Sequence, residues 1–404
     1  MAERIVVVGA GQAGLSLVEA LRAGGFDGSL TLVGAEDAPP YQRPPLSKKY
    51  LLGEMSADRL WLKPHAFYDD QRIELLLDAT AERIDRAGRQ VILADGRALP
   101  YDQLALTTGA RPRLPPAGIG GALAGVYPVR TLADVDAMEP EFVEGRRALI
   151  VGGGYIGLEA AAVAAAKRLA VTLIEAAPRI LGRVAAPETA AYFRDLHRRH
   201  GVDLREGVGL ARLEGEDGRV RRAALADGAT LEIDFALIGI GILPNAELAE
   251  AAGLTIDNGI AVDAAGRSSD PDIFAAGDCA SFPWRGARIR LESVQNAIDQ
   301  AQAAAKAMLG AAVTYDPTPW FWSDQYDVKL QIAGLNLGYD RVVTRPGSRE
   351  GAQSIWYFGP AGLLAIDAMN DPRAYMVGKR LLEQGKTVDP ETAADPAADL
   401  KALL

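Results

Sequence analysis

Cysteine and histidine are scarce in this sequence. Its 404 residues include one cysteine, Cys279, and three histidines, His65, His197 and His200. One cysteine cannot form an internal disulfide or a CxxC redox pair. With so few histidines as well, a protein-bound zinc or iron–sulfur site is not expected, and we predict no metal site.

Long apolar runs and an excess of basic charge are also missing. No window reaches the ~18 uninterrupted apolar residues of a membrane span. The formal net charge of −10 argues against general nucleic-acid binding. A glycine motif begins at Gly9, directly after an apolar run, so no cleavable signal peptide is expected. These absences predict a cytoplasmic globular protein that binds neither a membrane nor a nucleic acid.

The sequence does contain a near-repeat. Residues 5–14 read IVVVGAGQAG, and residues 149–157 read LIVGGGYIG. In each unit an apolar run precedes Gly-x-Gly-x-x-Gly, an alanine- and leucine-rich helical stretch follows, and a second apolar run leads to an acid. Glu36 is that acid in the first unit, and Glu175 is that acid in the second. The chain therefore predicts two βαβ units.

Each glycine of these motifs has a physical reason. The first permits a tight turn, the second lets the backbone approach a pyrophosphate, and the third lets helix and strand pack closely. The helix then offers free N–H groups and the positive end of its dipole to the anion. A dinucleotide is expected at each of the two motifs, whose glycines are Gly9, Gly11 and Gly14, and Gly152, Gly154 and Gly157.

Glu175 indicates which nicotinamide cofactor is used. It directly ends the second apolar run of its unit, and no basic residue follows until Arg179. A carboxylate at this position accepts hydrogen bonds from both ribose hydroxyls and repels a 2′-phosphate. The sequence therefore favours NADH over NADPH, the alternative being that Glu175 is a solvated acid.

Two further segments each fit a functional and an ordinary interpretation. Asp278 follows Gly277 at the end of an apolar run, where it can bond the ribityl chain of FAD or be a simple loop acid. Lys48, in the run PPLSK, can pair with Glu159 just past the second glycine motif, or be solvated. Ser47 is expected to cap a short helix at the same place.

The last part of the chain, from Ser293, also leaves alternatives open. The helix expected after Ser293 either directs its N-terminus at the flavin or lies plainly on the surface. The aromatic residues of 319–326 fit either the core of a small C-terminal domain or a wall over the nicotinamide pocket. The acidic stretch from Val388 predicts a poorly ordered tail or a short terminal helix.

The order of these motifs resembles the FAD-dependent, NADH-using ferredoxin reductases of bacterial monooxygenase and dioxygenase systems. Among them it resembles the putidaredoxin-reductase type, which serves cytochrome P-450 enzymes. The resemblance covers nearly the whole chain and rests on the segments VVVGAGQAG, PPLSK, LTTGARP, VRTLAD, IVGGGYIGLE, GIGILPN, FAAGDCA, ESVQNA and PWFWSDQY.

The resemblance implies an α/β fold with two Rossmann-like dinucleotide-binding domains, glutathione-reductase-like, and a smaller α+β C-terminal domain. It implies a discontinuous FAD-binding domain of residues 1–112 and 243–315. The NAD-binding domain is expected at 113–242, and an interface domain is expected at 316–404.

The resemblance also implies the site residues. Lys48 and Glu159 are the expected catalytic pair, near flavin N5. The expected FAD contacts are Gly9, Gly11, Ala13, Gly14, Ala35, Glu36, Arg43, Lys48, Ala81, Arg130, Asp278 and Val294. The expected NAD contacts are Gly152, Gly154, Tyr155, Ile156, Gly157, Glu175, Arg183 and Gly241. Position 35 is alanine where some relatives are expected to have an acid, so the ribose contact is left open between Ala35 and Glu36.

The function implied is transfer of electrons from NADH through FAD to a [2Fe–2S] ferredoxin, which in turn serves a cytochrome P-450. Alternatives are the reductase of an aromatic-ring dioxygenase system, an NADH oxidase, a nitrite-reductase-like flavoprotein and a redox-sensing flavoprotein. Disulfide reductases of this fold need a CxxxxC pair, which is missing. NADH oxidases use a cysteine soon after the first βαβ unit, where this chain reads Tyr41–Pro44. Cys279 is therefore expected to be a buried neighbour of the FAD.

An acidic ferredoxin calls for a basic docking face, despite the overall negative charge. The cluster of Arg285, Arg288 and Arg290 is one candidate, and Lys63 with Trp322 is another part of the same hypothesis. All of these side chains fit a solvated surface equally well.

Overall fold

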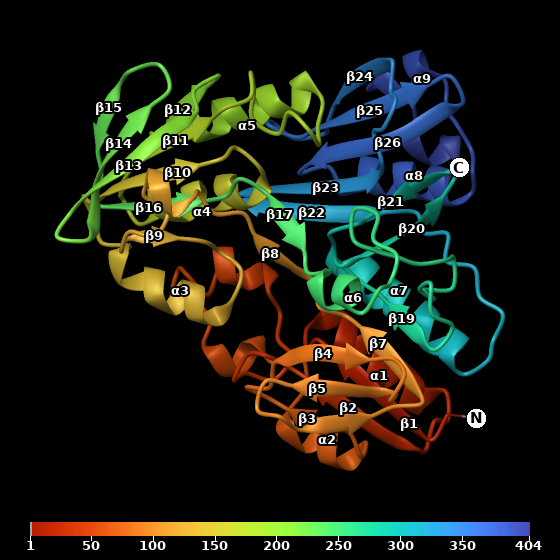
Figure 1. Ribbon diagram of the computed structural model, residues 1–404. Helices are drawn as coiled ribbons and strands as arrows, with labels where there is room; N and C mark the ends of the chain where they lie inside the picture. Colours follow the sequence, from red (N-terminus) through yellow and green to blue (C-terminus); the bar gives the residue numbers. More distant parts are fainter. Residues whose placement is uncertain (1) are drawn as a thin grey trace. The chain divides into compact units, whose positions relative to one another are not determined.

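The structure is a computed structural model that describes residues 2–404 (Figure 1). The chain forms two compact units, each assembled from three segments. Unit 1 contains residues 2–42, 57–111 and 243–317, and unit 2 contains residues 43–56, 112–242 and 318–404. Strands β8 (Ala110–Pro112) and β17 (Ile242–Pro244) contain two of the five points at which the chain passes from one unit to the other. Within the described residues, no helix has the length and apolar character needed to span a membrane.

The centre of unit 1 is a five-stranded parallel sheet in the order β19-β7-β1-β2-β3. Because β1 lies between β2 and β7, the strand order reverses at the carboxyl end of β1. Open α/β sheets bind their ligands at such a point. The strands are β1 (Arg4–Val8), β2 (Ser29–Val33), β3 (Glu74–Leu76), β7 (Gln103–Leu106) and β19 (Ile273–Ala275).

Helices α1 (Gln12–Ala23) and α7 (Val294–Met308) pack together in the core of unit 1. Leu17 and Leu21 of α1 are fully buried, as are Ala301 and Ala304 of α7. The small alanine side chains let the two helices approach closely, and each buried leucine contributes ~2 kcal/mol. The hydroxyl of Ser293 accepts a hydrogen bond from the N–H of Asn296, so the helix expected after Ser293 is present with its cap.

Two small antiparallel pairings and short helices complete unit 1. One sheet consists of β4 (Ala81–Asp85), β5 (Gln90–Leu93) and β6 (Ala98–Pro100). In the other, β20 (Ala280–Trp284) pairs antiparallel with β21 (Ala287–Ile289) and parallel with β18 (Ile260–Ala261). The short helices are α2 (His65–Asp70), α6 (Glu247–Ala251) and η2 (Ala57–Leu60).

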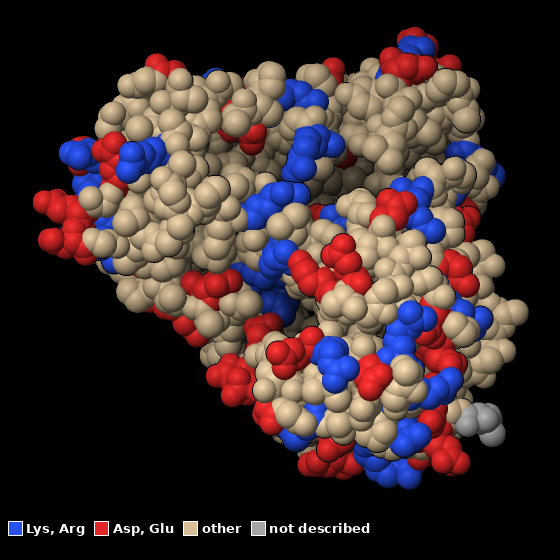
Figure 2. All heavy atoms as spheres, in the orientation of Figure 1, with Lys and Arg blue, Asp and Glu red and all other residues tan. Residues whose placement is uncertain are grey.

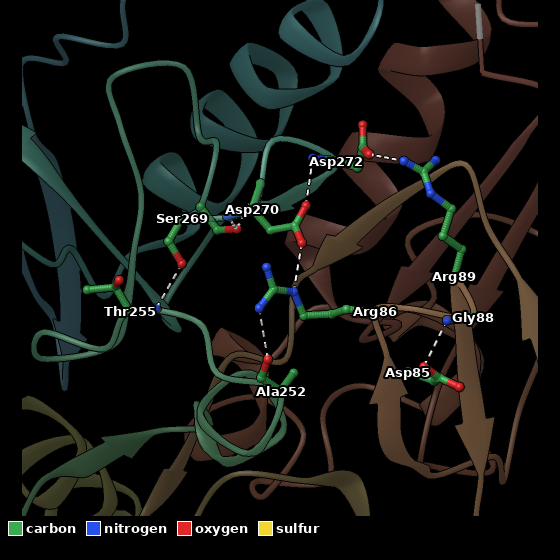
Figure 3. A network of polar contacts seen from close by, with 10 residues as sticks. Asp85, Arg86, Gly88, Arg89, Ala252, Thr255, Ser269, Asp270 and Asp272 are labelled. Carbon is green, nitrogen blue, oxygen red and sulfur yellow. Dashed lines mark hydrogen bonds and ion pairs between the residues drawn. The ribbon is translucent and has the colours of Figure 1, made fainter.

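Ion pairs join the second and third segments of unit 1 (Figure 3). Arg86, which directly follows β4, donates to Asp270 at 2.7 Å and to the carbonyl of Ala252 at 3.3 Å. Arg89 pairs with Asp272 in the same way. The β4–β5 hairpin is therefore fastened to a segment almost two hundred residues later, which explains how a discontinuous unit holds together.

Unit 2 repeats the parallel arrangement of unit 1. Its sheet has the order β12-β11-β10-β16-β9, again with the strand before the glycine motif at the reversal point. Its elements are β9 (Val126–Tyr127), β10 (Arg147–Val151), β11 (Ala170–Glu175), β12 (Asp203–Glu206), β16 (Phe235–Ile238), α3 (Leu132–Met138), α4 (Tyr155–Ala166) and α5 (Pro187–Arg199). A small antiparallel sheet consists of β13 (Leu210–Glu216), β14 (Arg219–Leu225) and β15 (Thr230–Glu232), and the 3₁₀ turns are η1 (Pro44–Ser47), η3 (Ala117–Ile119) and η4 (Glu139–Glu141).

The last part of unit 2 is an antiparallel sheet in the order β22-β23-β26-β25-β24, packed against α8 (Pro372–Glu383). Its strands are β22 (Trp320–Gln325), β23 (Val328–Gly334), β24 (Arg341–Pro346), β25 (Gln353–Gly359) and β26 (Gly362–Met369). The expected fold class is confirmed: two Rossmann-like parts and a smaller α+β part. The expected domain boundaries stay predictions.

The C-terminal stretch forms short helices, one of the two expected outcomes. Helix α9 (Pro390–Ala394) and the 3₁₀ turn η5 (Leu400–Leu403) follow α8. The buried guanidinium of Arg345 donates to the backbone carbonyls of Asp395 at 2.6 Å and Ala398 at 2.8 Å. These bonds and the burial of Leu400 hold the acidic tail against the sheet.

Candidate cofactor and catalytic site

The first glycine turn, in unit 1, has the shape that a dinucleotide needs. Gly9 has φ of +115°, and a Cβ there would lie 2.2 Å from the carbonyl oxygen of Thr107. A Cβ on Gly14 would lie 2.0 Å from the carbonyl oxygen of Gly9. A Cβ on Gly11 would meet nothing within 4 Å. Gly9 and Gly14 are therefore required by the turn itself, whereas the open face at Gly11 leaves room for a pyrophosphate at the start of α1.

The second glycine turn, in unit 2, has the same construction. Gly152 has φ of +107°, and a Cβ there would lie 2.3 Å from the carbonyl oxygen of Gly239. A Cβ on Gly157 would lie 2.0 Å from the carbonyl oxygen of Gly152, and one on Gly154 would meet nothing within 4 Å. In each turn the first and third glycines leave no room for a side chain, and the second faces open space. The residues present therefore fit one dinucleotide at each turn.

Glu175 is held rigidly at the second turn. Its Oε2 accepts a hydrogen bond from the N–H of Gly153 and its Oε1 accepts one from the N–H of Ala177, both at 2.7 Å. In the next strand, Glu206 pairs in register with Glu175. Burial alone would raise the pKa of Glu206, but hydrogen bonds from Arg194 and the N–H of Ile180 lower it overall. Glu206 therefore stays charged, and the end of β11 is an acidic site.

At the first turn the acid, Glu36, is held by a side chain, whereas backbone N–H groups hold Glu175. Glu36 Oε2 accepts a hydrogen bond from the hydroxyl of Tyr41 at 2.6 Å, while Ala35 is exposed. The loop that contains Asp278 lies beside this turn, because a Cβ on Gly277 would lie 3.0 Å from the Cβ of Ala13. The structure thus brings the Asp278 segment to the first glycine motif, as an FAD site in unit 1 requires.

Lys48 and Glu159 form an ion pair in unit 2. Lys48 Nζ lies 2.8 Å from Glu159 Oε2, with the Glu159 side chain 3% exposed. The same oxygen accepts a hydrogen bond from the hydroxyl of Ser47 at 2.8 Å, and Oε1 accepts one from the hydroxyl of Ser323 at 2.7 Å. The pairing expected from the sequence is present. The expected cap by Ser47 is wrong, because Ser47 is the last residue of η1 and its hydroxyl donates to Glu159.

Ser47 and Ser323 join the site although the sequence does not predict them as site residues. Ser323 and Gln325 are two residues apart on β22, and both are fully buried, which an alternating strand pattern can indicate. Nothing in the sequence indicates that β22 packs against α4, so the contact with Glu159 follows only from the tertiary fold.

The remaining predicted NAD contacts lie around the second turn. Tyr155 begins α4, and its ring lies 5.0 Å from that of Phe321 on β22. Ile156 is an exposed apolar residue, 44% accessible, at the start of the same helix. A Cβ on Gly241 would lie 3.5 Å from the exposed guanidinium of Arg183. Phe321 thus borders the turn, which favours the pocket-wall interpretation for part of the aromatic segment.

The remaining predicted FAD contacts fall in both units. Ala81 begins β4 and Val294 begins α7, both in unit 1. In unit 2, Arg43 donates to the carbonyl of Arg130 at 2.7 Å, which holds the segment before Lys48 to the start of α3. The assignment of all these residues to a cofactor stays a prediction.

Cys279 is fully buried, as expected. Its thiol lies 3.4 Å from the carbonyls of Leu106 and Ala276, to which it donates. Burial raises the pKa of the thiol. A buried thiol of raised pKa is a poor nucleophile, so the structure gives Cys279 a packing role.

The proposed basic docking cluster is largely engaged within unit 1. Arg288 donates to the carbonyls of Ser281 at 2.7 Å and Val262 at 3.0 Å. Arg290 donates to the carbonyl of Asp278 at 3.1 Å, and its side chain is 9% exposed. Lys63 pairs with Glu19. Lys and Arg side chains are interspersed with Asp and Glu side chains over much of the face that Figure 2 shows.

Comparisons with known proteins agree with this geometry. Residues 3–305 match the family described as pyridine nucleotide-disulphide oxidoreductase, and residues 320–404 match the reductase C-terminal family. Putidaredoxin reductase, solved in a covalent complex with putidaredoxin, is 39% identical, with 99% of this chain and 98% of that chain covered and a TM-score of 0.95. The ferredoxin reductase for the CYP199A2 system from Rhodopseudomonas palustris is 41% identical, with both chains fully covered and a TM-score of 0.95.

A third relative is named as part of a dioxygenase system. The ferredoxin–NAD(+) reductase component of the anthranilate 1,2-dioxygenase system from Burkholderia cepacia is 41% identical, with both chains covered over their full length. The resemblance seen in the sequence is confirmed. The chain therefore belongs to the pyridine nucleotide-disulphide oxidoreductase family, and within it to the ferredoxin reductases, oxidoreductases that bind FAD and NAD(H).

Proposed function

We propose that this protein oxidises NADH and passes the electrons through FAD, one at a time, to a [2Fe–2S] ferredoxin that serves a cytochrome P-450 monooxygenase. In balance, one NADH and two oxidised ferredoxins give NAD⁺, two reduced ferredoxins and one proton. Bound FAD supplies the step from a two-electron donor to one-electron acceptors. The proposal rests on the pair of glycine turns. In each turn the second glycine, Gly11 or Gly154, faces open space in which a pyrophosphate can approach the backbone.

The first turn is proposed for FAD and the second for NADH. Asp278 and Val294 belong to the same unit as the first turn, which supports placing the polyol and ring of FAD beside them. Glu175 belongs to the second turn, where two backbone N–H groups fix its carboxylate. A fixed negative charge accepts the hydroxyls of an NADH ribose and repels the phosphate of NADPH.

The ion pair of Lys48 and Glu159 is the proposed catalytic pair near flavin N5. The Glu159 carboxylate has three hydrogen-bonding partners, the Lys48 ammonium and the hydroxyls of Ser47 and Ser323. The carboxylate in turn holds the Lys48 ammonium in a fixed place. The positive charge then stabilises negative charge that develops on the neighbouring flavin ring.

The acceptor is the part of the proposal that relatives support most directly. Relatives of equal similarity are named for a putidaredoxin complex, a CYP199A2 system and a dioxygenase system. The P-450 system is proposed because the motif order favours the putidaredoxin-reductase type. The dioxygenase system is the second candidate, favoured by the full-length match to the anthranilate relative.

Two other expectations stay proposals. The division into an FAD-binding domain (1–112 and 243–315), an NAD-binding domain (113–242) and an interface domain (316–404) is one. A cytoplasmic location is the other, for which the lone, reduced cysteine is the supporting observation.

Stopped-flow absorbance tests the function directly. Mixed with NADH without oxygen, the yellow holoenzyme is expected to bleach, and an added [2Fe–2S] ferredoxin is expected to restore its colour as the ferredoxin is reduced. Ferredoxins of a P-450 system and of a dioxygenase system are compared under the same conditions. Equal rates with both would remove the preference for P-450, and no reduction of either would contradict the proposal.

A further inference from the structure

Glu159 is an acidic side chain, paired with Lys48, in an otherwise apolar helix. Helix α4 reads YIGLEAAAVAAA, and its residues from Gly157 to Ala164 are all buried. A buried carboxylate is tolerated only when its oxygens are paired or hydrogen-bonded. Oε2 pairs with the Lys48 ammonium and accepts a hydrogen bond from Ser47. Oε1 accepts a hydrogen bond from Ser323, which lies on β22. The second oxygen therefore depends on the C-terminal sheet.

Ser323 is itself one member of a longer chain of side chains within unit 2. Gln325 Nε2 lies 3.2 Å from Ser323 Oγ, and Gln325 Oε1 lies 2.8 Å from His197 Nε2. The other ring nitrogen, His197 Nδ1, lies 3.2 Å from the hydroxyl of Tyr326. Ser323, Gln325 and His197 are all fully buried. The chain thus runs from the last turn of α5, through β22, to the carboxylate on α4.

The donor and acceptor groups of these side chains give every hydrogen bond the same donor-to-acceptor direction, from Tyr326 toward Glu159. An ionised carboxylate only accepts, so Ser323 donates to Glu159 and must accept from the amide of Gln325. The amide oxygen of Gln325 then accepts from His197 Nε2, so His197 carries its hydrogen on Nε2. Burial lowers the pKa of His197 to about 4, which keeps the ring neutral. Nδ1 is then free of hydrogen and accepts from Tyr326.

We propose that His197 is a positioning residue that, through Gln325 and Ser323, holds the Glu159 carboxylate in one orientation and so fixes the Lys48 ammonium. Hydrogen bonds that all point one way polarise and strengthen one another, and here they end on the charged group. Loss of Ser323 leaves Oε1 without its donor, whereas loss of Gln325 or His197 leaves the Ser323 hydroxyl free to turn away from Oε1. The inference rests on the proposed function of the Lys48–Glu159 pair beside the flavin.

A chain that only stabilises the fold would give a different result, and the protein contains a matched control. Thr189 lies on the same helix as His197 and is also fully buried. Its hydroxyl donates to Asp367 of the C-terminal sheet at 2.8 Å. In the described structure this bond does not lead to Glu159. Thr189→Val therefore removes a buried hydrogen bond between α5 and a different strand, β26, of the same C-terminal sheet, and it leaves the chain through β22 intact.

The first experiment compares Ser323→Ala, Gln325→Leu and His197→Leu with Thr189→Val. The readouts are the visible spectrum and midpoint potential of bound FAD, and the rate at which NADH reduces it. The three chain variants are expected to shift spectrum and potential and to slow reduction about three- to tenfold. His197→Gln places an amide N–H near the position of Nε2 and is expected to restore most of the rate. Thr189→Val is expected to lower Tm alone.

The second experiment needs no variant to report. The chain has only three histidines, so ¹⁵N-histidine labelling of the holoenzyme gives three imidazole signals, assigned with His200→Ala and His65→Ala. His197 is expected as the neutral Nε2–H form. A ring with its hydrogen on Nδ1, or a charged ring near neutral pH, would overturn the proposed direction of the chain.

Lys48→Met separates this inference from the function on which it rests. If that variant leaves the flavin spectrum and reduction rate unchanged, the proposed role of the ion pair fails. If it changes both, while Ser323→Ala and Gln325→Leu behave like Thr189→Val, the role of the ion pair stands and the positioning chain is overturned.

Discussion

The backbone N–H of Gly153 donates to the carboxylate of Glu175 at 2.7 Å, so the glycine turn and the acid that ends β11 are one rigid assembly. The acid is held by the turn that is proposed to receive the pyrophosphate. A ribose attached to that pyrophosphate therefore meets a carboxylate whose position is already fixed, and little ordering remains to be done on binding.

Removing this charge is expected to weaken the choice of NADH. In Glu175→Gln the side chain keeps an oxygen that accepts a backbone N–H but loses the charge that repels a 2′-phosphate. The ratio of kcat/KM for NADH to that for NADPH is expected to fall by about tenfold or more, mainly through KM. Steady-state kinetics with both cofactors measure this ratio. An unchanged ratio would show that another residue sets the preference.

The two glycine substitutions at the first turn are expected to fail in different ways. Gly11→Ala adds a methyl group where nothing lies within 4 Å, so the chain folds and only the approach of FAD is hindered. Gly14→Ala places its Cβ 2.0 Å from the Gly9 carbonyl oxygen and is expected to cost several kcal/mol of stability, about 3 or more. FAD content, circular dichroism and Tm distinguish the two. A Gly11→Ala protein with full FAD content would contradict the assignment of this face to the pyrophosphate.

Cys279 is expected to be dispensable for turnover. In Cys279→Ala the buried position stays filled by a small apolar side chain, and only weak hydrogen bonds to Leu106 and Ala276 are lost. The loss of stability is expected to be about 1 kcal/mol. NADH-dependent reduction of an acceptor dye should be unchanged within about twofold. The folded wild-type thiol should also resist alkylation, and a large loss of turnover would restore the possibility of thiol chemistry.

Asp367 is expected to make stability depend on pH. Burial raises its pKa from 3.8 to about 6, although hydroxyl donors from Thr189 and Tyr357 oppose the shift. The folded protein thus binds this proton more tightly than the unfolded chain does. The stability from this group is complete below about pH 4 and is lost as pH rises through about 6, with a total of at most about 3 kcal/mol.

Asp367→Asn tests that sign. The amide oxygen can accept the same two hydroxyl donors, and the side chain has no charge to bury. The difference in Tm, variant minus wild type, is expected to be small near pH 4 and to become more positive by about pH 7. A difference that instead becomes more negative as pH rises would show that the carboxylate is stabilised in the fold.

Local sequence patterns determined a large part of this protein. The glycine turns depend on residues that are close together in the chain, and a missing Cβ at Gly9 or Gly152 has a direct steric meaning. Apolar runs before each turn become β1 and β10, and a hydroxyl before an alanine-rich stretch becomes the cap of α7. The family, the fold class and both cofactors could therefore be inferred from the order of residues alone.

Distant pairings were decided only by the tertiary structure. Lys48 and Glu159 are more than a hundred residues apart, so the sequence leaves their pairing as one of two alternatives, and the packing of η1 against α4 decides it. Strand alternation can indicate that Ser323 and Gln325 are buried, but nothing local in the sequence indicates that these two residues and His197 form one chain. Arg288 and Arg290 resemble a basic cluster in sequence, yet they bind backbone carbonyls of their own unit. Short-range sterics are written in neighbouring residues, whereas a buried charge acquires its partners only when strands and helices far apart in the chain are packed together.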